Sequence, residues 1–175
     1  MHKDVAEILI SEEQIQARCK ELGKELTDYY KDKNLTLIGL LKGSVPFMVD
    51  LMKCIDLDLQ IDFMDVSSYS GTDSQEVRIL KDVECSITDR DVLIVEDIID
   101  TGKTLEAVVQ LLYSKGARNV KIVTLLDKPE GRTVNMNADF VGFKVPNKFV
   151  IGYGLDYNQK YRNLPYVGVI KKEAI

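Results

Sequence analysis

The hydrophobic pattern is strongest in the middle of the chain, where residues 92–105 have the sequence VLIVEDIIDTGKTL. Val92 to Val95 form an uninterrupted apolar run, which is typical of a parallel strand buried on both faces. Carboxylates and small polar residues follow, and from Leu105 apolar residues recur at helical spacing until Gly116. The stretch predicts a strand, a polar loop and a helix. A ligand site is expected beyond the carboxyl end of such a strand.

The remaining apolar pattern divides the chain into alternating helices and strands. Ser11-Glu12-Glu13-Gln14 has the form of a capping box, and it opens a helix whose apolar stripe is Ile15, Cys19, Leu22, Leu26 and Tyr29. A second helix is predicted at 47–53, and further strands at 35–41, 57–66, 77–80, 120–126 and 167–170. This alternation in 175 residues predicts one α/β domain, with a mostly parallel twisted core sheet and helices on both faces.

Composition and charge narrow the kind of protein this is. A hydrophobic content of 45% and a charged content of 29% are ordinary for a soluble globular domain. The net charge of −5 argues against a general nucleic-acid binder, so we expect no nucleic acid as partner. No apolar run approaches the length of a membrane span, and the N-terminus lacks the basic-then-apolar order of a secretory signal. We therefore expect no membrane attachment.

Histidine and cysteine usage removes several mechanisms. The only histidine is His2, so Ser-His-Asp, Cys-His and His-rich zinc chemistry are all disfavoured. Cys19, Cys54 and Cys85 are odd in number and widely spaced, which argues against disulfides or a zinc cluster and fits a reducing cytoplasm. Acid–base chemistry must therefore come from carboxylates, lysines or tyrosines.

The polar loop has the chemistry of a sugar-phosphate site. Gly102 allows backbone N–H groups to turn inward, the hydroxyls of Thr101 and Thr104 add donors, and a helix N-terminus adds positive potential. Together these groups can hold a phosphate. Glu96 and Asp97 can each accept a hydrogen bond from a sugar hydroxyl, and they can hold Mg²⁺. A phosphate site beside two hydroxyl acceptors describes a ribose 5-phosphate.

Two other interpretations of this loop stay open. One is a buried strand followed by an ordinary solvated acidic turn. The other is a nucleotide-triphosphate hydrolase, because Gly102-Lys103-Thr104 imitates the end of a phosphate-binding loop. That motif requires its first glycine at the position that Asp97 occupies.

The stretch resembles the phosphoribosyl pyrophosphate signature of the type I phosphoribosyltransferases. Asp100 resembles the 6-oxopurine branch of that family, the hypoxanthine (hypoxanthine-guanine) phosphoribosyltransferases, because the adenine branch has a small residue there. Matching blocks extend over nearly the whole chain. The resemblance implies a purine-salvage transferase that moves ribose 5-phosphate from phosphoribosyl pyrophosphate to hypoxanthine, and to guanine, with Mg²⁺ as cofactor and pyrophosphate as second product.

The resemblance also assigns roles to residues around the loop. Asp100 would be the general base that accepts the purine proton. Glu96 and Asp97 would hold the ribose hydroxyls and Mg²⁺. The 5′-phosphate would lie against Thr101, Gly102, Lys103 and Thr104. Pyrophosphate would contact the Lys42-Gly43 loop, and a mobile lid at about 67–76, with Ser68 and Tyr69 as its recognisable pair, would close over it.

The purine would be bound by the end of the 120–126 strand and by a small hood formed by segments at about 144–175. Lys128 would donate to the exocyclic oxygen of the purine. Phe149 would stack on its ring, and backbone groups of Val150 and Asp156 would contact its edge. The Asp156 side chain would hold a second Mg²⁺, and Arg162 would donate to pyrophosphate.

Two alternatives to this function are a regulatory binding protein of the same fold and an enzyme that uses a different base. Some proteins of this fold bind nucleotides and RNA as regulators of pyrimidine genes. An enzyme that prefers xanthine or uracil is the nearer rival, and Asp127-Lys128-Pro129 favours a 6-oxopurine over uracil. Members of the family form dimers and tetramers, so a homodimer or homotetramer is expected.

Overall fold

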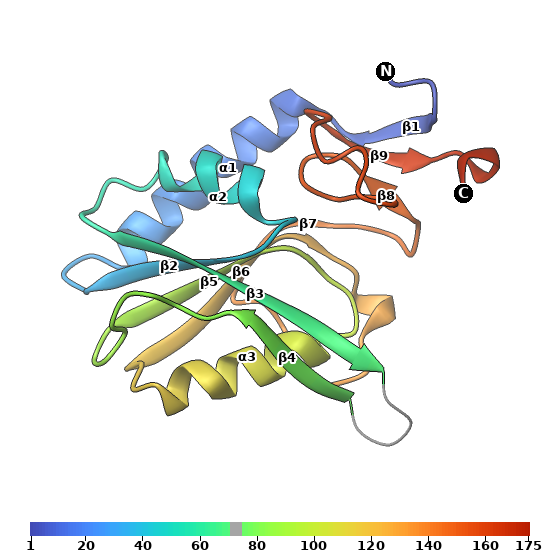
Figure 1. The fold of residues 1–175 in the computed structure, drawn as a ribbon. Helices are drawn as coiled ribbons and strands as arrows, with labels where there is room; N and C mark the ends of the chain where they lie inside the picture. Colours follow the sequence, from blue (N-terminus) through green and yellow to red (C-terminus); the bar gives the residue numbers. More distant parts are fainter. Residues whose placement is uncertain (71–74) are drawn as a thin grey trace.

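The structure is a computed structural model that describes residues 1–70 and 75–175, with side chains described except at 68–70, 75 and 76. Figure 1 shows a large sheet flanked by helices and a small sheet beside it. Over the described residues, the elements are β1 (Val5–Ile10), α1 (Glu12–Tyr29), β2 (Leu35–Leu40), α2 (Val45–Met52), β3 (Gln60–Ser70), β4 (Gln75–Lys81), β5 (Asp91–Ile99), α3 (Lys103–Ser114), β6 (Asn119–Asp127), η1 (Pro129–Gly131), β7 (Phe140–Lys144), β8 (Val150–Ile151), β9 (Val167–Ile170) and η2 (Lys172–Ala174).

The large sheet has the strand order β4-β3-β2-β5-β6-β7. Its neighbours are parallel from β3 to β7, and β4 alone runs antiparallel, against β3. The chain passes from β2 outward to β3 and then returns to place β5 on the other side of β2. The strand order therefore changes direction between β2 and β5, and such a crevice is where α/β sheets bind ligands.

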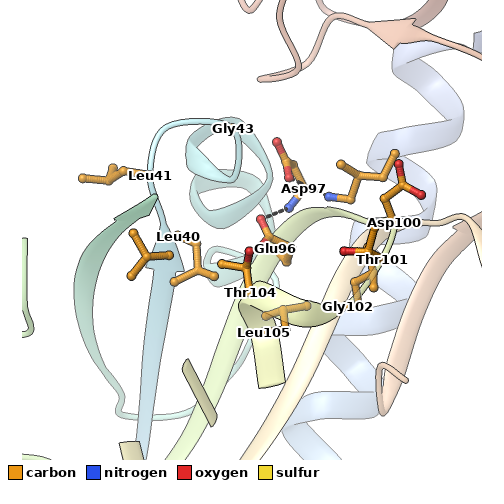
Figure 2. A pocket seen from close by; sticks show the side chains of 13 residues that line it. Leu40, Leu41, Gly43, Glu96, Asp97, Asp100, Thr101, Gly102, Thr104 and Leu105 are labelled. Atoms are coloured by element: carbon orange, nitrogen blue, oxygen red, sulfur yellow. Dashed lines mark hydrogen bonds between the residues drawn. The ribbon is translucent and has the colours of Figure 1, made fainter. Parts of the chain in front are cut away.

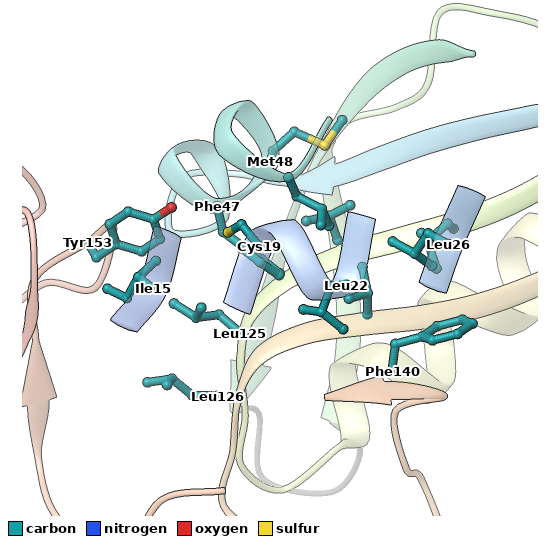
Figure 3. Packing of buried hydrophobic residues seen from close by; sticks show 14 of the residues in the cluster. Ile15, Cys19, Leu22, Leu26, Phe47, Met48, Leu125, Leu126, Phe140 and Tyr153 are labelled. Atoms are coloured by element: carbon teal, nitrogen blue, oxygen red, sulfur yellow. The ribbon is translucent and has the colours of Figure 1, made fainter. Parts of the chain in front are cut away.

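Helices cover both faces of this sheet, as predicted (Figure 1). The helices α1 and α2 pack on one face and α3 packs on the other. In α1 the side chains of Ile15, Cys19, Leu22 and Leu26 are fully buried (Figure 3). The predicted fifth member of the stripe is wrong, because Tyr29 is 38% exposed and Tyr30 is buried instead. Helical spacing from Leu26 does not distinguish Tyr29 from Tyr30, because the two tyrosines are adjacent at the end of the helix.

The capping box of α1 is formed by the predicted residues. Ser11 Oγ accepts a hydrogen bond from the Gln14 amide at 3.3 Å, and the Ser11 amide donates to Gln14 Oε1 at 2.8 Å. Two amide groups at the start of α1 are thereby satisfied. The start of α2 differs from the prediction, because it begins at Val45 rather than Phe47, with Pro46 in its first turn.

The central strand is longer than the apolar run indicated. β5 continues from Asp91 to Ile99, so Glu96 and Asp97 lie on the strand and not in the loop after it. The reason is the ladder with β6, which continues past the carboxylates through the pair Ile98↔Leu126. The two carboxylates are thus held by strand geometry at the rim of the sheet.

The segment predicted as a lid at 67–76 belongs partly to strands. β3 reaches Ser70 and β4 begins at Gln75, with Ser67 paired to Arg78. Residues 71–74 lie outside the described part of the chain. The side chains of Ser68 and Tyr69 are also outside the description, so their predicted contacts stay predictions.

A three-stranded antiparallel sheet with the order β1-β9-β8 forms the hood, and both chain ends lie beside it (Figure 1). Val5 of β1 pairs with Ile170 of β9, so the N-terminal segment completes a sheet whose other strands come from the predicted hood region. Val5, Ile151 and Ile170 form its small buried core. Among the described residues, no helix has the length and apolar character needed to cross a membrane.

Candidate active site

A cleft opens at the point where the strand order changes direction, beyond the carboxyl ends of β2 and β5. We name it the sheet cleft; its volume is about 230 Å³ (Figure 2). It is lined by Leu40, Leu41, Gly43, Val66, Glu96, Asp97, Ile98, Ile99, Asp100, Thr101, Gly102, Thr104 and Leu105. Most of the residues predicted to hold ribose 5-phosphate therefore lie together in one site.

The N-terminus of α3 forms one end of the sheet cleft. Gly102 is its N-cap and has a left-handed backbone with φ of +86°, a conformation that costs other residues energy. The Lys103 amide donates to Thr101 Oγ1 at 3.4 Å, which tightens the turn. Lys103 lines a separate hollow together with Val77 of β4, and it is not among the residues that line the sheet cleft. The turn and helix end present the donors expected for a phosphate.

Two neighbouring carboxylates, Glu96 and Asp97, lie in the sheet cleft. The Asp97 amide donates to Glu96 Oε1 at 2.9 Å (Figure 2). The Ile98 amide donates to Asp97 Oδ1 at 2.7 Å. Burial raises the pKa of Glu96 well above its usual range, and the adjacent Asp97 carboxylate raises it further. Burial also raises the pKa of Asp97, against the opposing effect of the Arg162 charge. The pair is therefore short of positive charge and suits a cation.

Three backbone segments converge around Gly43. A Cβ atom on Gly43 would lie 1.6 Å from Asp97 Oδ2, and one on Gly154 would lie 1.9 Å from the Gly43 carbonyl oxygen. Only glycines fit this contact between the β2–α2 loop, β5 and the hood. A cis peptide bond joins Leu41 to Lys42, and the side chain of Lys42 is exposed and outside the lining of the cleft. A contact of Lys42 with pyrophosphate stays a prediction.

A second cleft, which we name the hood cleft, lies between the rim of the sheet and the hood. Its volume is about 300 Å³. It shares Asp97, Ile98 and Asp100 with the sheet cleft, and its other lining residues are Lys128, Lys148, Phe149, Val150, Leu155 and Asp156. The residues predicted to bind the purine are thus gathered in one place, adjoining the predicted ribose site at Asp100.

Lys128 and Phe149 give the hood cleft its chemistry. The side chain of Lys128 is nearly buried, and its Nζ atom lies 3.7 Å from Asp100 Oδ2. The Phe149 ring is 50% exposed and meets Tyr157 edge-on, with ring centroids 5.7 Å apart. An exposed aromatic face beside a lysine donor can stack on a flat base and donate to its oxygen.

Asp156, which lines the hood cleft, forms an ion pair with Arg162, with Oδ1 and Nη2 2.9 Å apart. The Gln159 amide also donates to Asp156 at 2.9 Å, and Arg162 donates to the Gly154 carbonyl at 2.7 Å. The two residues predicted to hold Mg²⁺ and pyrophosphate are therefore paired with each other here. Either partner could exchange this contact for a ligand of opposite charge.

The carboxylates of the two clefts meet part of what Mg²⁺ requires. Across residues 1–70 and 75–175, no cluster of three or more His, Cys, Asp or Glu side chains could hold a metal by itself. Mg²⁺ usually takes only one or two protein carboxylates, together with water and substrate phosphates. Glu96 with Asp97, and Asp156 separately, fit ions shared with a phosphorylated substrate. They do not fit a metal held by protein alone.

Sequence reasoning missed the residues that support Asp100 from outside the clefts. Arg132 donates to the carbonyl oxygens of Ile99 and Asp100, and Gly131 packs against the Asp100 carboxylate. The available signal was an arginine four residues after Lys128, at the carboxyl end of a strand that neighbours β5. Asp127, which is the acidic partner of Arg132, belongs to the block Asp127-Lys128-Pro129, but no role was predicted for its side chain.

Comparison with known proteins fits this architecture. The family described as "Phosphoribosyl transferase domain" matches residues 6–158, so the chain belongs to the phosphoribosyltransferase family. A hypoxanthine-guanine phosphoribosyltransferase of Bacillus subtilis is 57% identical over 173 residues, which are 98% of this chain and 96% of that protein. A crystal structure of a hypoxanthine phosphoribosyltransferase from Staphylococcus aureus has a TM-score of 0.96 at 53% identity, covering 99% of this chain and 96% of that one. The resemblance to the hypoxanthine-guanine branch and the predicted fold are both confirmed.

A third relative is longer than this chain. The "Bifunctional protein TilS/HprT" of Listeria monocytogenes is 55% identical over 175 residues, which cover 99% of this chain. The chain spans 27% of the length of that relative.

Proposed function

We propose that this chain transfers ribose 5-phosphate from phosphoribosyl pyrophosphate to hypoxanthine and guanine, giving the purine nucleotide and pyrophosphate. This proposal rests on one observation: the sheet cleft, with its donors for phosphate and acceptors for hydroxyls, and the hood cleft, with Phe149 and Lys128, meet at the exposed carboxylate of Asp100. A phosphorylated ribose in the first and a purine in the second would bring their reacting atoms together beside it. The relatives' names refer to the same activity, and it would serve purine salvage.

The proposed reaction replaces a carbon–oxygen bond by a carbon–nitrogen bond and moves one proton. A purine nitrogen attacks the anomeric carbon, and the bond from that carbon to pyrophosphate breaks, with its electron pair leaving on the pyrophosphate oxygen. The purine N–H proton passes to an Asp100 oxygen. Lys128 donates to the exocyclic oxygen of the base, and Phe149 holds the ring plane.

The ribose and its charged groups would be held by the rest of the site. The turn at Gly102 would bind the 5′-phosphate, and Glu96 and Asp97 would accept from the ribose hydroxyls. Mg²⁺, held by Glu96 and Asp97 or by Asp156, would neutralise the leaving pyrophosphate when bound. Arg162 would do the same through its planar donors after release from Asp156. A homodimer or homotetramer, and a cytoplasmic location, stay predictions of the sequence.

A pyrophosphate-release assay tests the activity. The enzyme would receive phosphoribosyl pyrophosphate, Mg²⁺ and, separately, hypoxanthine, guanine, xanthine, adenine or uracil. Pyrophosphate release with hypoxanthine and with guanine is the expected outcome. Preference for xanthine would correct the base specificity. If phosphoribosyl pyrophosphate binds but none of the five bases reacts, a regulatory nucleotide- or RNA-binding protein replaces the proposed enzyme.

The variant Asp100→Asn tests the assigned base. Loss of general-base catalysis typically costs about 10²–10⁴-fold in rate, so kcat should fall by that range. The affinity for phosphoribosyl pyrophosphate should change little, because Asp100 lies at the base end of the sheet cleft. Glu106→Gln is the matched control, since this carboxylate lies in the first turn of α3 and faces the hollow outside the clefts. An unchanged kcat in Asp100→Asn would remove Asp100 from the mechanism.

A further inference from the structure

A guanidinium group clamps the backbone on which Asp100 is carried. One nitrogen of Arg132, Nη1, donates to the carbonyl oxygens of Ile99 at 3.1 Å and of Asp100 at 2.7 Å. The other terminal nitrogen, Nη2, donates to the Asp127 carboxylate. The side chains of Arg132 and Asp127 are only 11% and 10% exposed. The contact is therefore a largely desolvated, charge-assisted one.

The chain around Arg132 follows the Asp100 loop closely. The Lys128 amide donates to the Ile99 carbonyl at 3.0 Å, and the Thr133 amide donates to the Thr101 carbonyl at 3.1 Å. A Cβ atom on Gly131 would lie 1.7 Å from Asp100 Oδ1, so any side chain there would displace the carboxylate. The segment 128–133 thus supports the loop, and of its residues only Lys128 lines one of the two clefts.

Asp100 needs this support because the sheet ends just before it. The last register pair of β5 with β6 is Ile99↔Asp127, so the Asp100 carbonyl lies beyond the ladder. Its bond from Arg132 takes the place of a strand partner. An arginine suits this position because its planar fork can reach two carbonyls and a carboxylate at once, whereas a lysine ammonium cannot hold that geometry.

We infer that Arg132 is a positioning residue for the reaction, acting through the backbone of Asp100 and anchored by Asp127. Arg132 is not among the described residues that line either cleft, so it contributes by placing the Asp100 carboxylate. This inference rests on the proposed role of Asp100. A misplacement of about 1 Å in a reacting group can cost about 100-fold in rate.

The test is Arg132→Lys, measured in the first turnover by rapid quench so that product release does not hide the chemical step. The rate should fall by about 100-fold. The Kd of phosphoribosyl pyrophosphate should stay close to that of the parent, because the cleft lining is intact. A parent-like rate in the folded variant would overturn the inference.

The matched control is Arg18→Lys. Arg18 donates to the carbonyls of Gly142 at 3.1 Å and Val141 at 2.8 Å, and its third bond goes to the Glu21 carboxylate at 2.8 Å. The same chemistry therefore joins α1 to β7, away from both clefts. Arg18→Lys should keep the parent rate even where it lowers the melting temperature. A similar fall in both variants would mean general loosening and would also overturn the inference.

A double-mutant cycle separates positioning from a merely structural role. In the Asp100→Asn background, Arg132→Lys should change the rate by no more than about twofold, because the carboxylate that it places is already absent. A full 100-fold further loss would show that Arg132 acts independently of Asp100. A parent-like rate for Asp100→Asn alone would instead refute the proposed base, so the two failures are distinguishable.

If Arg132→Lys does not fold, Asp127→Asn carries the same test. Asparagine keeps an oxygen acceptor for the guanidinium but loses the charge. We expect a smaller fall, about 10-fold, in the first-turnover rate, again absent in the Asp100→Asn background. A parent-like rate would show that Arg132 needs no anchor and would overturn the role of Asp127.

Discussion

The sheet cleft and the hood cleft meet at Asp100 but are built in different ways. Most of the sheet cleft comes from one continuous stretch, residues 96–105, where β5 passes into α3. The hood cleft combines Asp100 with Lys128 from the end of β6 and with Phe149, Val150 and Asp156 from the hood. One cleft depends on a strand, a turn and a helix end, and the other depends on the docking of a separate small sheet.

The docking of the hood is held by specific contacts. Tyr153 follows β8, and its hydroxyl donates to Asp50 of α2 at 2.6 Å. Gln16 of α1 donates to the same carboxylate oxygen at 2.8 Å. Gly154 then packs directly on the Gly43 carbonyl. Changes in the hood can therefore alter the base site while the phosphate site keeps its local structure.

The largest separation is expected from Lys128→Met, which removes the ammonium but keeps most of the apolar stem. A hydrogen bond to a charged group is worth about 1.5–3 kcal/mol. The KM for hypoxanthine should therefore rise by about 10–100-fold. The Kd of phosphoribosyl pyrophosphate, measured by calorimetry, should change little.

Lys121→Met is the control for that variant. Lys121 lies on the same strand, β6, and pairs with Asp139 at 3.1 Å, away from the hood cleft. It should leave both affinities unchanged. Equal losses of base and phosphoribosyl pyrophosphate affinity in Lys128→Met would contradict the assignment of the base to the hood cleft and of phosphoribosyl pyrophosphate to the sheet cleft.

Gly102→Ala changes the sheet cleft and leaves the hood cleft unchanged, and Gly116→Ala is its control. Both glycines have left-handed backbones, with φ of +86° and +92°, and they flank the two ends of α3. An alanine in that conformation costs about 1–2 kcal/mol in either place. Both variants should therefore lose stability, which thermal unfolding would measure.

Only Gly102→Ala should also weaken phosphoribosyl pyrophosphate binding, by about 10-fold, a factor equivalent to about 1.4 kcal/mol. The reason is that its Cβ atom would lie 3.0 Å from Met136 Cβ, so either Met136 or the phosphate turn must give way slightly. The KM for hypoxanthine should stay near the parent value. If Gly116→Ala weakens binding as much, the turn has no special part in holding phosphate.

The same contrast explains what could be predicted from the sequence. The sheet cleft was predictable because its groups are adjacent in the chain: a buried run, then Glu96, Asp97, Asp100 and a glycine turn. Strand periodicity alone placed Glu96 in a loop, because the continuation of the ladder beside β6 depends on a neighbouring strand.

The hood cleft was predictable only through the family resemblance. Nothing local marks Phe149 as a stacking residue, since an aromatic beside Val150 usually belongs to a core. The contribution of β1 to the hood sheet also depends on residues at the other end of the chain, as Val5↔Ile170 shows. Arg132 was missed for the same reason, because its partners Ile99 and Asp100 come from another strand.

The smallest expected effect concerns Glu96, which lines the sheet cleft. Burial and the Asp97 charge raise the pKa of Glu96 in the folded protein, whereas in the unfolded chain it is about 4.3. At low pH the Glu96 carboxyl group is protonated in both the folded and the unfolded protein, so no buried charge lowers the free energy of unfolding. Between the unfolded-state pKa and the higher folded-state pKa, the unfolded chain gives up this proton while the folded protein retains it, so stability is lost as pH rises through that interval.

Glu96→Gln removes that charge and should raise the melting temperature at pH 8. One kcal/mol corresponds to about 2–4 °C for a domain of this size, so a gain of that order is expected. The gain should vanish near pH 4, and Glu25→Gln, at an exposed site on α1, should show no such pH dependence. The same variant should bind phosphoribosyl pyrophosphate with Mg²⁺ more weakly, since the carboxylate pair is incomplete. A variant that is less stable than the parent at pH 8 would show that the Glu96 charge is already compensated within the protein.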